Sequence, residues 1–174
     1  MNEKIILERP GPQHMDDVFS YMQEHIGQGE YHLHGSGGLD KALSYEEWLE
    51  DLRHEQTQPK EGLVPATTFF AVRKHDRKLI GAIQIRHELN DFLLKYYGHI
   101  GFGVRPMERK KGYATQMLGL ALDYCRQLGL ENILISCDKT NAASAATIQK
   151  CGGVLENEVA QEDGSLLQRY WISL

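Results

Sequence analysis

The chain has 174 residues, of which 41% are hydrophobic and 25% are charged, and its formal net charge is −5. These values are ordinary for a soluble globular protein, and the length allows one sizeable core. The acidic balance argues against general binding to nucleic acids or to membrane surfaces. No apolar run is long enough for a signal peptide or a membrane span, so we expect a single cytoplasmic domain over residues 1–174.

The N-terminal part of the chain predicts one strand and two helices. Residues 5–8 read as a strand that a proline-glycine-proline run ends. Apolar residues at helical spacing then predict a helix from Met15 to about Gly27. Ser44 can cap the second helix, with Glu47 as its capping-box partner.

A long loop rich in glycine and histidine, residues 28–41, separates these two helices. His32 and His34 alternate with Leu33, so both imidazoles can face one space. A loop of this length is often a lid or a binding wall, and the other interpretation is a solvated loop without a role. Glu30, His32 and His34 are therefore candidate substrate-binding residues, and no metal-like spacing surrounds them.

The middle of the chain predicts a hairpin of residues 67–72 and 79–85, followed by an irregular connection over residues 90–97. The end predicts a second hairpin, residues 154–159 and 166–172. Cys125 and Cys137 fall in apolar patterns and are expected in the core. With Cys151 they are an odd set without the spacing of a zinc site or a disulfide framework, so we expect no metal.

The most informative stretch is a strand, a basic turn and a helix over residues 99–129. Ile100, Phe102 and Val104 alternate with glycines, as in a strand that Pro106 ends. The apolar period then changes to that of a helix, which Gly129 can cap. Between them lies a turn that contains four basic residues and one glycine: Arg105, Arg109, Lys110, Lys111 and Gly112.

This basic turn has the chemistry of an anion site. A helix N-terminus offers unpaired backbone N–H groups and a partial positive charge, both of which suit phosphate. Gly112 allows close approach of the backbone to a ligand. A cationic cluster on an acidic chain favours the same interpretation, although a solvated basic helix start is the simpler alternative.

Two segments together resemble the GNAT superfamily of N-acetyltransferases. Arg109-x-x-Gly112-x-Ala114 after a strand is similar to its acyl-CoA pyrophosphate loop, which reads Gln or Arg, two residues, Gly, one residue, Gly or Ala. Asn141-x-x-Ser144, which opens a second helix after a strand at residues 133–137, resembles its second cofactor segment. The resemblance implies an α/β fold with a mixed, mostly antiparallel central sheet, flanking helices and a splay between the central strands.

The resemblance also implies acetyl-CoA as co-substrate and names residues that bind it. The end of the central strand would contact the pantetheine arm, and the loop with Thr115 would bind pyrophosphate. Asn141 and Ser144 would reach the arm or the leaving thiol, while simple helix capping is the alternative for Asn141. The expected cofactor residues are Phe102, Gly103, Val104, Arg109, Lys110, Lys111, Gly112, Tyr113, Ala114, Thr115, Asn141 and Ser144.

Catalysis would require a base for the incoming ammonium and an acid for the departing thiolate. His99 and Glu88 are the candidate bases, with His87 as a further substrate contact, and His99 can equally be a structural strand histidine. The tyrosine acid that many family members carry four positions after Ser144 is replaced by Ile148. Ser144, Tyr170 or water could serve instead, or the thiolate could leave unassisted.

The sequence thus predicts an N-acetyltransferase that moves acetyl from acetyl-CoA to a primary amine of a small molecule or a protein. The alternative is a noncatalytic acyl-CoA-binding or sensor domain on the same fold. A nucleotide hydrolase is disfavoured because no Walker lysine is present. A homodimer through the C-terminal hairpin is compatible with the resemblance.

Overall fold

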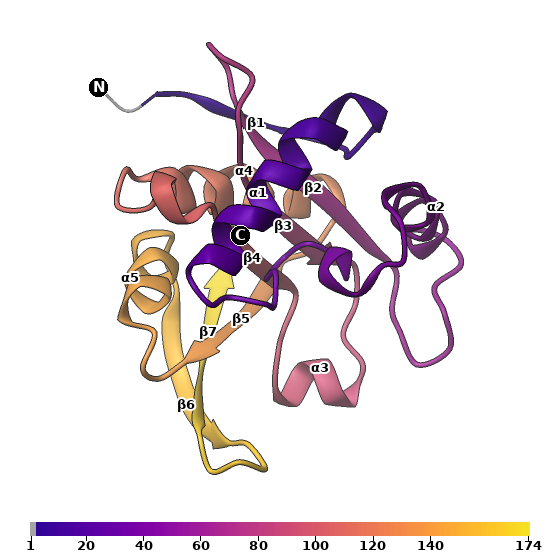
Figure 1. Cartoon of the computed structure of the whole chain (residues 1–174). Coiled ribbons are helices and arrows are strands. Elements are labelled where there is room, and N and C mark those ends of the chain that lie inside the picture. The colour runs from indigo at the N-terminus through magenta and orange to yellow at the C-terminus, as the bar shows by residue number, and fades with distance from the viewer. Residues whose placement is uncertain (1–2) are drawn as a thin grey trace.

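The computed structural model describes residues 3–174. Its strands form two antiparallel sheets with the orders β1-β2-β3-β4 and β5-β7-β6 (Figure 1). The expected α/β fold with mostly antiparallel pairing is confirmed. The strands are β1 (Ile5–Glu8), β2 (Ala66–Arg73), β3 (Leu79–Arg86), β4 (Ile100–Val104), β5 (Asn132–Asp138), β6 (Val154–Ala160) and β7 (Leu166–Ser173).

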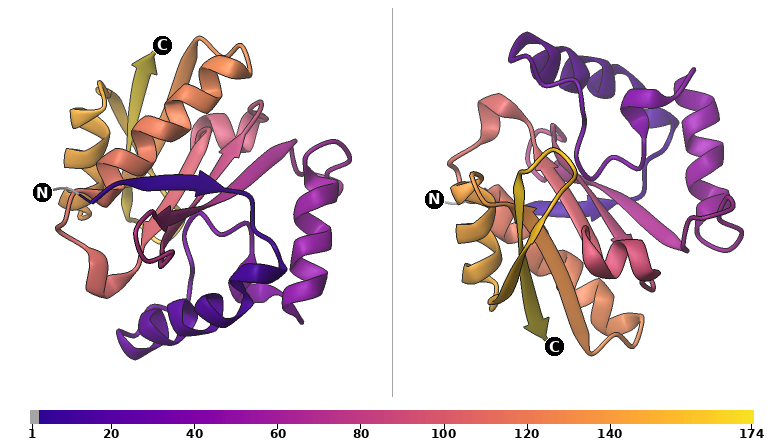
Figure 2. Two further views of the ribbon diagram at one scale, coloured as in Figure 1. Left: turned by 90° about the horizontal axis from the view of Figure 1, so that it is seen from above. Right: turned by 90° about the horizontal axis from the view of Figure 1, so that it is seen from below.

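Helices cover both faces of the first sheet. Figure 2 shows α1 and α2 on one side of the first sheet and α4 and α5 on the other. In residues 3–174, no helix combines the length and the apolarity that crossing a membrane requires. The helices are α1 (Met15–Gly27), α2 (Tyr45–Glu55), α3 (Asp91–Lys95), α4 (Tyr113–Gln127) and α5 (Ala142–Lys150).

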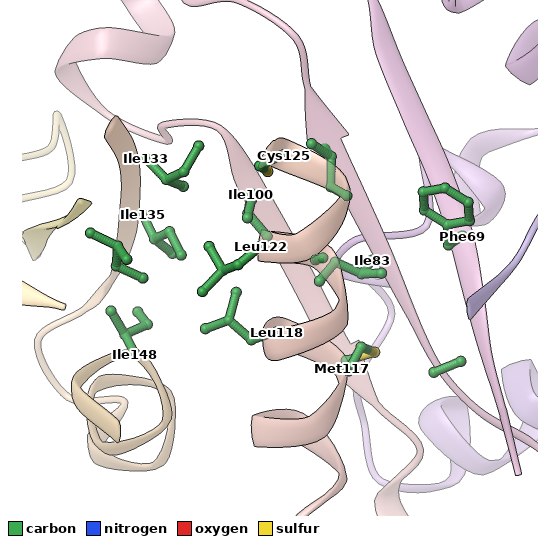
Figure 3. Close-up of a cluster of buried hydrophobic side chains, with 14 of the residues drawn as sticks. Phe69, Ile83, Ile100, Met117, Leu118, Leu122, Cys125, Ile133, Ile135 and Ile148 are labelled. Atoms are coloured by element: carbon green, nitrogen blue, oxygen red, sulfur yellow. The ribbon is translucent and has the colours of Figure 1, made fainter. Parts of the chain in front are cut away.

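The larger core lies around α4, between the two sheets (Figure 3). Its apolar stripe, which includes Met117, Leu118 and Cys125, is fully buried against Ile100 of β4 and Ile133 of β5. Burial of one such side chain contributes about 1.5–3 kcal/mol. Both cysteines that were expected in the core are buried there. The helix that follows the basic turn is therefore fixed along its whole apolar face.

A second core lies on the opposite face, under α1 and α2. Trp48 of α2 stacks on Phe70 of β2 with ring centroids 5.5 Å apart. Leu33 and Leu39, from the loop between the two helices, are also buried in this core. The loop is consequently packed onto the sheet at two points.

Within residues 3–174, backbone hydrogen bonds join the two sheets just before β4. An isolated bridge joins Gly98 to Ile135, and His99 and Leu134 exchange two further hydrogen bonds. In the described residues, no strand pairs with the far edge of β4 from Ile100 to Val104. The splay that the sequence predicted is therefore present, and it leaves one edge of β4 open.

Most predicted element boundaries agree with the structure, with one exception. Ser44 Oγ accepts a hydrogen bond from Glu47 N at 3.1 Å, so the predicted N-cap of α2 is confirmed. The connection over residues 90–97 is wrong as an irregular segment, because it contains the short helix α3. Asn90 caps this helix by accepting from Leu93 N at 2.9 Å.

Candidate active site

The loop between α1 and α2 crosses the glycine face of β4. A Cβ atom on Gly103 would lie 2.8 Å from the carbonyl oxygen of His34, and one on Gly101 would lie 3.8 Å from Gly35 N. Gly35 itself has φ +73° and presses against the backbone of β3 and β4. The two strand glycines suggested that another backbone comes close to β4. On this face, that backbone is the loop between α1 and α2.

The N-terminus of α4 presents free backbone amides. Gly112 is its N-cap, with φ +81° in the left-handed region that favours glycine. The first intrahelical bond runs from Gln116 N to Gly112 O, so the amides of Tyr113, Ala114 and Thr115 have no partner within the helix. No acidic residue lies in this first turn. The turn is thus a suitable anion site.

The four basic residues of the turn do not all face this anion site. Arg105 is buried and pairs with Asp17 at 2.8 Å. Lys111 pairs with Glu108 at 2.9 Å. Within residues 3–174, Lys110 has no carboxylate within ion-pair distance. Arg109 pairs with Glu30, so Lys110 is the member of the four without a carboxylate partner in the described residues.

Glu108 stabilises the basic turn through three charged hydrogen bonds. Its buried carboxylate receives Lys78 at 2.7 Å, Lys111 at 2.9 Å and Arg73 at 3.1 Å. Burial alone would raise its pKa, but the hydrogen bonds from Lys111 and Lys78 outweigh burial and bring the pKa to about 2. The turn that carries the free amides is therefore held by a charged network that stays ionised at neutral pH.

Arg109 joins the turn to the loop between α1 and α2. Its two terminal nitrogens bind the two oxygens of Glu30 at 2.7 and 2.6 Å, and its Nε donates to the carbonyl of Val104 at 3.0 Å. The hydrogen bond from Arg109 is the main cause that brings the pKa of Glu30 to about 2. His25 Nδ1 lies 2.8 Å from the same carboxylate. Glu30, predicted to bind substrate, is thus engaged in an internal ion pair.

The start of α5 forms the opposite wall. Asn141 accepts from Ser144 N at 3.1 Å, which confirms the capping geometry. Ile148 is fully buried in the α4 core. Tyr170 is buried as well and donates to Gln168 Oε1 at 2.8 Å. Neither Ile148 nor Tyr170 lines the space next to Ser144.

A cavity of about 770 Å³ opens between these walls. Its lining combines the open end of β4, the N-terminus of α4, the start of α5 and the loop between α1 and α2. Most residues that the sequence predicted to bind cofactor or substrate line it together: Glu30, His32, His34, Phe102, Gly103, Val104, Arg109, Lys110, Gly112, Tyr113, Ala114, Thr115, Asn141 and Ser144.

Four predicted residues do not line this cavity. Lys111 turns to Glu108, and Glu88 is exposed beyond the end of β3. His87 lies 2.8 Å from Thr67 Oγ1, which in turn contacts Tyr124 of α4.

The fourth is His99, which is buried and bound to β5. Its Nδ1 accepts from Leu134 N at 3.0 Å. Burial and the nearby charge of Arg86 bring its pKa to about 4. Protonation of Nδ1 would also displace the Leu134 N–H, so the folded state favours neutral His99.

Some lining residues were missed by sequence reasoning. Tyr31, Thr147 and Lys150 face the cavity. Thr147 lies three residues after Ser144, so helical spacing places the two side chains on one side of α5. Lys150 follows three residues later. It lies in the last turn of α5, where a lysine is usually an ordinary surface residue, so the sequence did not single it out. The helical spacing from Ser144 was the available signal.

Comparison with known proteins agrees with this geometry. The acetyltransferase (GNAT) domain family matches residues 4–154. No curated protein sequence matches the chain.

Similar solved structures include an acetyltransferase from Salmonella typhimurium that modifies the N-terminal serine of ribosomal protein L7/L12. It is 16% identical, with a TM-score of 0.68 over 98% of this chain and 95% of that one. The spermidine N-acetyltransferase of Vibrio cholerae is 17% identical, with a TM-score of 0.68 over 97% and 93%.

The microcin C7 self-immunity acetyltransferase MccE, in complex with acetyl-CoA and AMP, is 19% identical, with a TM-score of 0.68 over 100% of this chain and 94% of that one. At these identities the likeness establishes the fold. The domain match, by contrast, extends over most of the sequence and over every wall of the cavity. The chain therefore belongs to the GNAT family of acetyltransferases, a family of acyltransferase enzymes.

Proposed function

We propose that residues 1–174 act as one N-acetyltransferase domain that moves an acetyl group from acetyl-CoA to a primary amine by direct attack in a ternary complex. The observation that carries this proposal is the composition of the cavity. One space of about 770 Å³ is bounded by the free amides of α4, the unpaired edge of β4 and the start of α5. These surfaces suit a phosphate, an amide-rich arm and a thiol, in that order.

Acetyl-CoA would bind with its pyrophosphate at the N-terminus of α4. The backbone amides of Tyr113, Ala114 and Thr115 would bind the pyrophosphate oxygens, and Lys110 and Lys150 would add positive charge from two walls. The pantetheine arm would follow the open edge of β4 past Phe102 and Gly103. The Val104 carbonyl already accepts a hydrogen bond from Arg109, so we expect the arm to depend less on it.

The thioester would then lie between the middle of β4 and Ser144. Backbone N–H groups along the open edge of β4 are suitable donors for the oxyanion of the tetrahedral intermediate. The departing thiolate is a good leaving group because a thiol has a pKa of about 8.5. A hydroxyl from Ser144 or Thr147, or water, can therefore replace the tyrosine acid whose position Ile148 occupies.

The acceptor would be a primary amine that approaches from the side of Tyr31 and His34. The similar structures include enzymes described as acting on spermidine and on a ribosomal protein N-terminus. Both acceptors are primary amines, and both belong in the first test of this chain.

Thermal stability tests the cofactor assignment. A ligand that binds only the native state at one hundred times its Kd stabilises it by about 2.7 kcal/mol. We expect acetyl-CoA, and not ATP, to raise the melting temperature. No shift with acetyl-CoA would refute the assignment of the cavity.

Release of free CoA then tests catalysis. Acetyl-CoA is mixed with spermidine or with a peptide that begins with serine, and the free thiol is followed over time. The same peptide with an acetylated N-terminus and no lysine is the control. We expect thiol release with at least one amine. Binding of acetyl-CoA without release for any amine would instead support the noncatalytic acyl-CoA-binding domain, which the replacement of the usual tyrosine by Ile148 favours.

A further inference from the structure

We infer that His34 is the general base that deprotonates the acceptor ammonium, and that His32 and Asp40 are the residues that position it. This inference rests on the proposed acetyl transfer and names a catalytic group for it. It arises from three contacts of the loop between α1 and α2: with Gly103 of β4, with Trp48 of α2 and within the loop itself.

The first contact places His34 beside the open strand. A Cβ atom added to Gly103 would lie 2.8 Å from the carbonyl oxygen of His34 and 3.5 Å from its Cβ. The His34 side chain therefore begins next to Gly103, and it lines the same cavity as Phe102 and Ser144. The start of α5 contributes to the same lining through Asn141 and Ser144.

The second contact fixes the loop. Trp48 Nε1 donates to the carbonyl oxygens of Ser36 and Gly37 at 3.0 and 3.2 Å. Ser36 is itself buried, and its Oγ accepts from Leu39 N at 3.2 Å. These bonds lie within five residues of His34, so the imidazole stands on a packed segment. A general base needs this fixed position to reach the proton it removes.

The third contact orients the histidine pair. Asp40 Oδ2 lies 3.0 Å from His32 Nδ1, and its Oδ1 is buried with no hydrogen-bond partner in residues 3–174. The His32 and His34 rings meet edge to face, with centroids 4.4 Å apart and an interplanar angle of 82°. Asp40 thus holds the ring of His32, and His32 limits the orientations of His34.

The charges around His34 suit proton removal. Burial lowers its pKa below 6.5, and His32 and His25 lower it further, while Asp40 and Glu30 oppose them. His34 is therefore mostly neutral at pH 7 and has a lone pair to accept a proton. The same lining also contains Arg109, whose charge Glu30 offsets, and the cations Lys110 and Lys150, which suit phosphate. Its other carboxylate, Glu108, is paired with Lys78, Lys111 and Arg73.

The proton and electron changes balance as follows. The acceptor ammonium gives one N–H proton to a ring nitrogen of His34, which leaves a lone pair on the amine. This pair attacks the thioester carbonyl carbon, a C–N bond forms, and the π electrons move to the oxygen. On collapse the C–S bond breaks and the thiolate leaves with its electrons. The second amine proton passes to the sulfur, and His34 returns the first proton to water.

The other candidate bases lack this combination of access and position. His99 is buried against β5, with its Nδ1 occupied by the Leu134 N–H. Glu88 is exposed and is not part of the cavity lining.

The test compares His34→Gln with the wild type on the amine that the thiol-release assay identifies. We expect kcat to fall on the order of 100-fold, since a general base contributes ~10²–10⁴ in rate. The Kd for acetyl-CoA should change less than about threefold, because the proposed phosphate contacts do not include His34. His75→Gln, at an exposed histidine of the β2–β3 turn, is the matched control and should keep wild-type values.

The pH profile separates a base from a structural residue. Wild-type kcat/KM should show an inflection below pH 6.5 that His34→Gln lacks. Asp40→Asn should lower this inflection, because removal of a negative charge favours the neutral imidazole. Added imidazole should partly restore His34→Ala.

Failures of the two proposals are distinguishable. An active wild type whose kcat and pH profile survive His34→Gln would overturn the base and leave acetyl transfer intact. A folded wild type that binds acetyl-CoA and transfers to no amine would overturn acetyl transfer, and the base with it.

Discussion

At the scale of single residues, His99 links the two sheets by hydrogen bonds just before β4. It donates its N–H to Leu134 O at 2.7 Å and accepts Leu134 N–H on its ring at 3.0 Å. A ring that accepts this bond must be neutral. The hydrogen bonds that join β4 to β5 therefore depend on the protonation state of the His99 imidazole.

This dependence predicts how stability changes with pH. The unfolded chain binds a proton at His99 near pH 6.5, whereas the folded chain binds it near pH 4. Unfolding is thus favoured as pH falls through this window, by up to about 1.4 kcal/mol per pH unit for one proton. We expect urea unfolding at pH 7, 6 and 5 to show a shallower loss for His99→Asn than for the wild type.

His99→Leu should lose on the order of 1–3 kcal/mol at pH 7, because Leu134 N–H then has no acceptor at this position. His75→Asn, at an exposed histidine, is the control. Equal pH slopes for His99→Asn and the wild type would contradict the neutral buried state.

Single residues could be predicted from the sequence where their geometry is local. Gly112 and the amides after it belong to one turn, so the motif and the following helix predicted the helix N-terminus that we propose as the anion site. Pairings between distant residues were not visible. Glu30 and Arg109 are 79 positions apart, and each was interpreted as a ligand contact before the fold brought them together. The assignments of His99 and Glu88 as bases and of His87 as a substrate contact stay predictions.

At the scale of elements, the N-terminus of α4 depends on the backbone of Gly112. Its φ of +81° strains any residue with a side chain, and a β-branched one most. The apolar stripe of α4 lies beyond this turn and is fully buried. The turn can therefore be distorted without loss of the helix.

Substitution at this position tests the phosphate site. We expect Gly112→Val to remain folded and to bind acetyl-CoA at least about tenfold more weakly, as measured by calorimetry. The local cost of a left-handed residue is ~1–2 kcal/mol. Gly119→Ala in the same helix is the matched control, because its added Cβ meets nothing within 4 Å. Equal affinities of a folded Gly112→Val and Gly119→Ala would exclude this turn as the phosphate site.

Elements with an apolar pattern were predictable, and α3 was not. In this helix Leu93 is buried, while Phe92 and Leu94 on either side of it are exposed. A single buried side chain gives no periodic signal. The cap at Asn90 was present in the sequence, but it had no amphipathic run behind it.

At the scale of the whole molecule, charge is distributed unevenly. The chain carries a net charge of −5, yet Lys110 and Lys150 meet at one cavity without carboxylate partners in residues 3–174. The net negative charge of the protein would repel a polyanionic cofactor, whereas Lys110 and Lys150 would attract it to the cavity. Binding should therefore respond strongly to salt, because the Debye length is about 10 Å at 0.1 M.

Removal of either lysine should weaken the binding of acetyl-CoA. We expect Lys110→Gln and Lys150→Gln each to raise the Kd for acetyl-CoA about two- to fivefold at low salt, and the difference to shrink at about 0.5 M salt. Lys74→Gln, in the β2–β3 turn, is the control. A salt-independent Kd would exclude a role for these charges.

The order of the elements followed from hydrophobic patterns along the whole sequence, whereas the splay between β4 and β5 was implied by the resemblance to the GNAT superfamily. The position of the loop between α1 and α2 did not follow from either, because its anchors are isolated residues. Gly35 fits against β3 and β4 by lacking a side chain, and Ser36 is held by an indole from α2. Such contacts leave no repeating signal in the sequence.

Under the proposed function, exchange of residues 28–41 for another loop would be a way to engineer a new acceptor preference on this scaffold. The ion pair between Glu30 and Arg109 limits how freely such a graft can be made. A transplanted segment that omits the carboxylate at position 30 would leave the Arg109 guanidinium on the Val104 carbonyl but without its carboxylate partner. The loop and the basic turn should therefore be exchanged together. A successful chimera would keep Glu30, Arg109 and Trp48 as one unit.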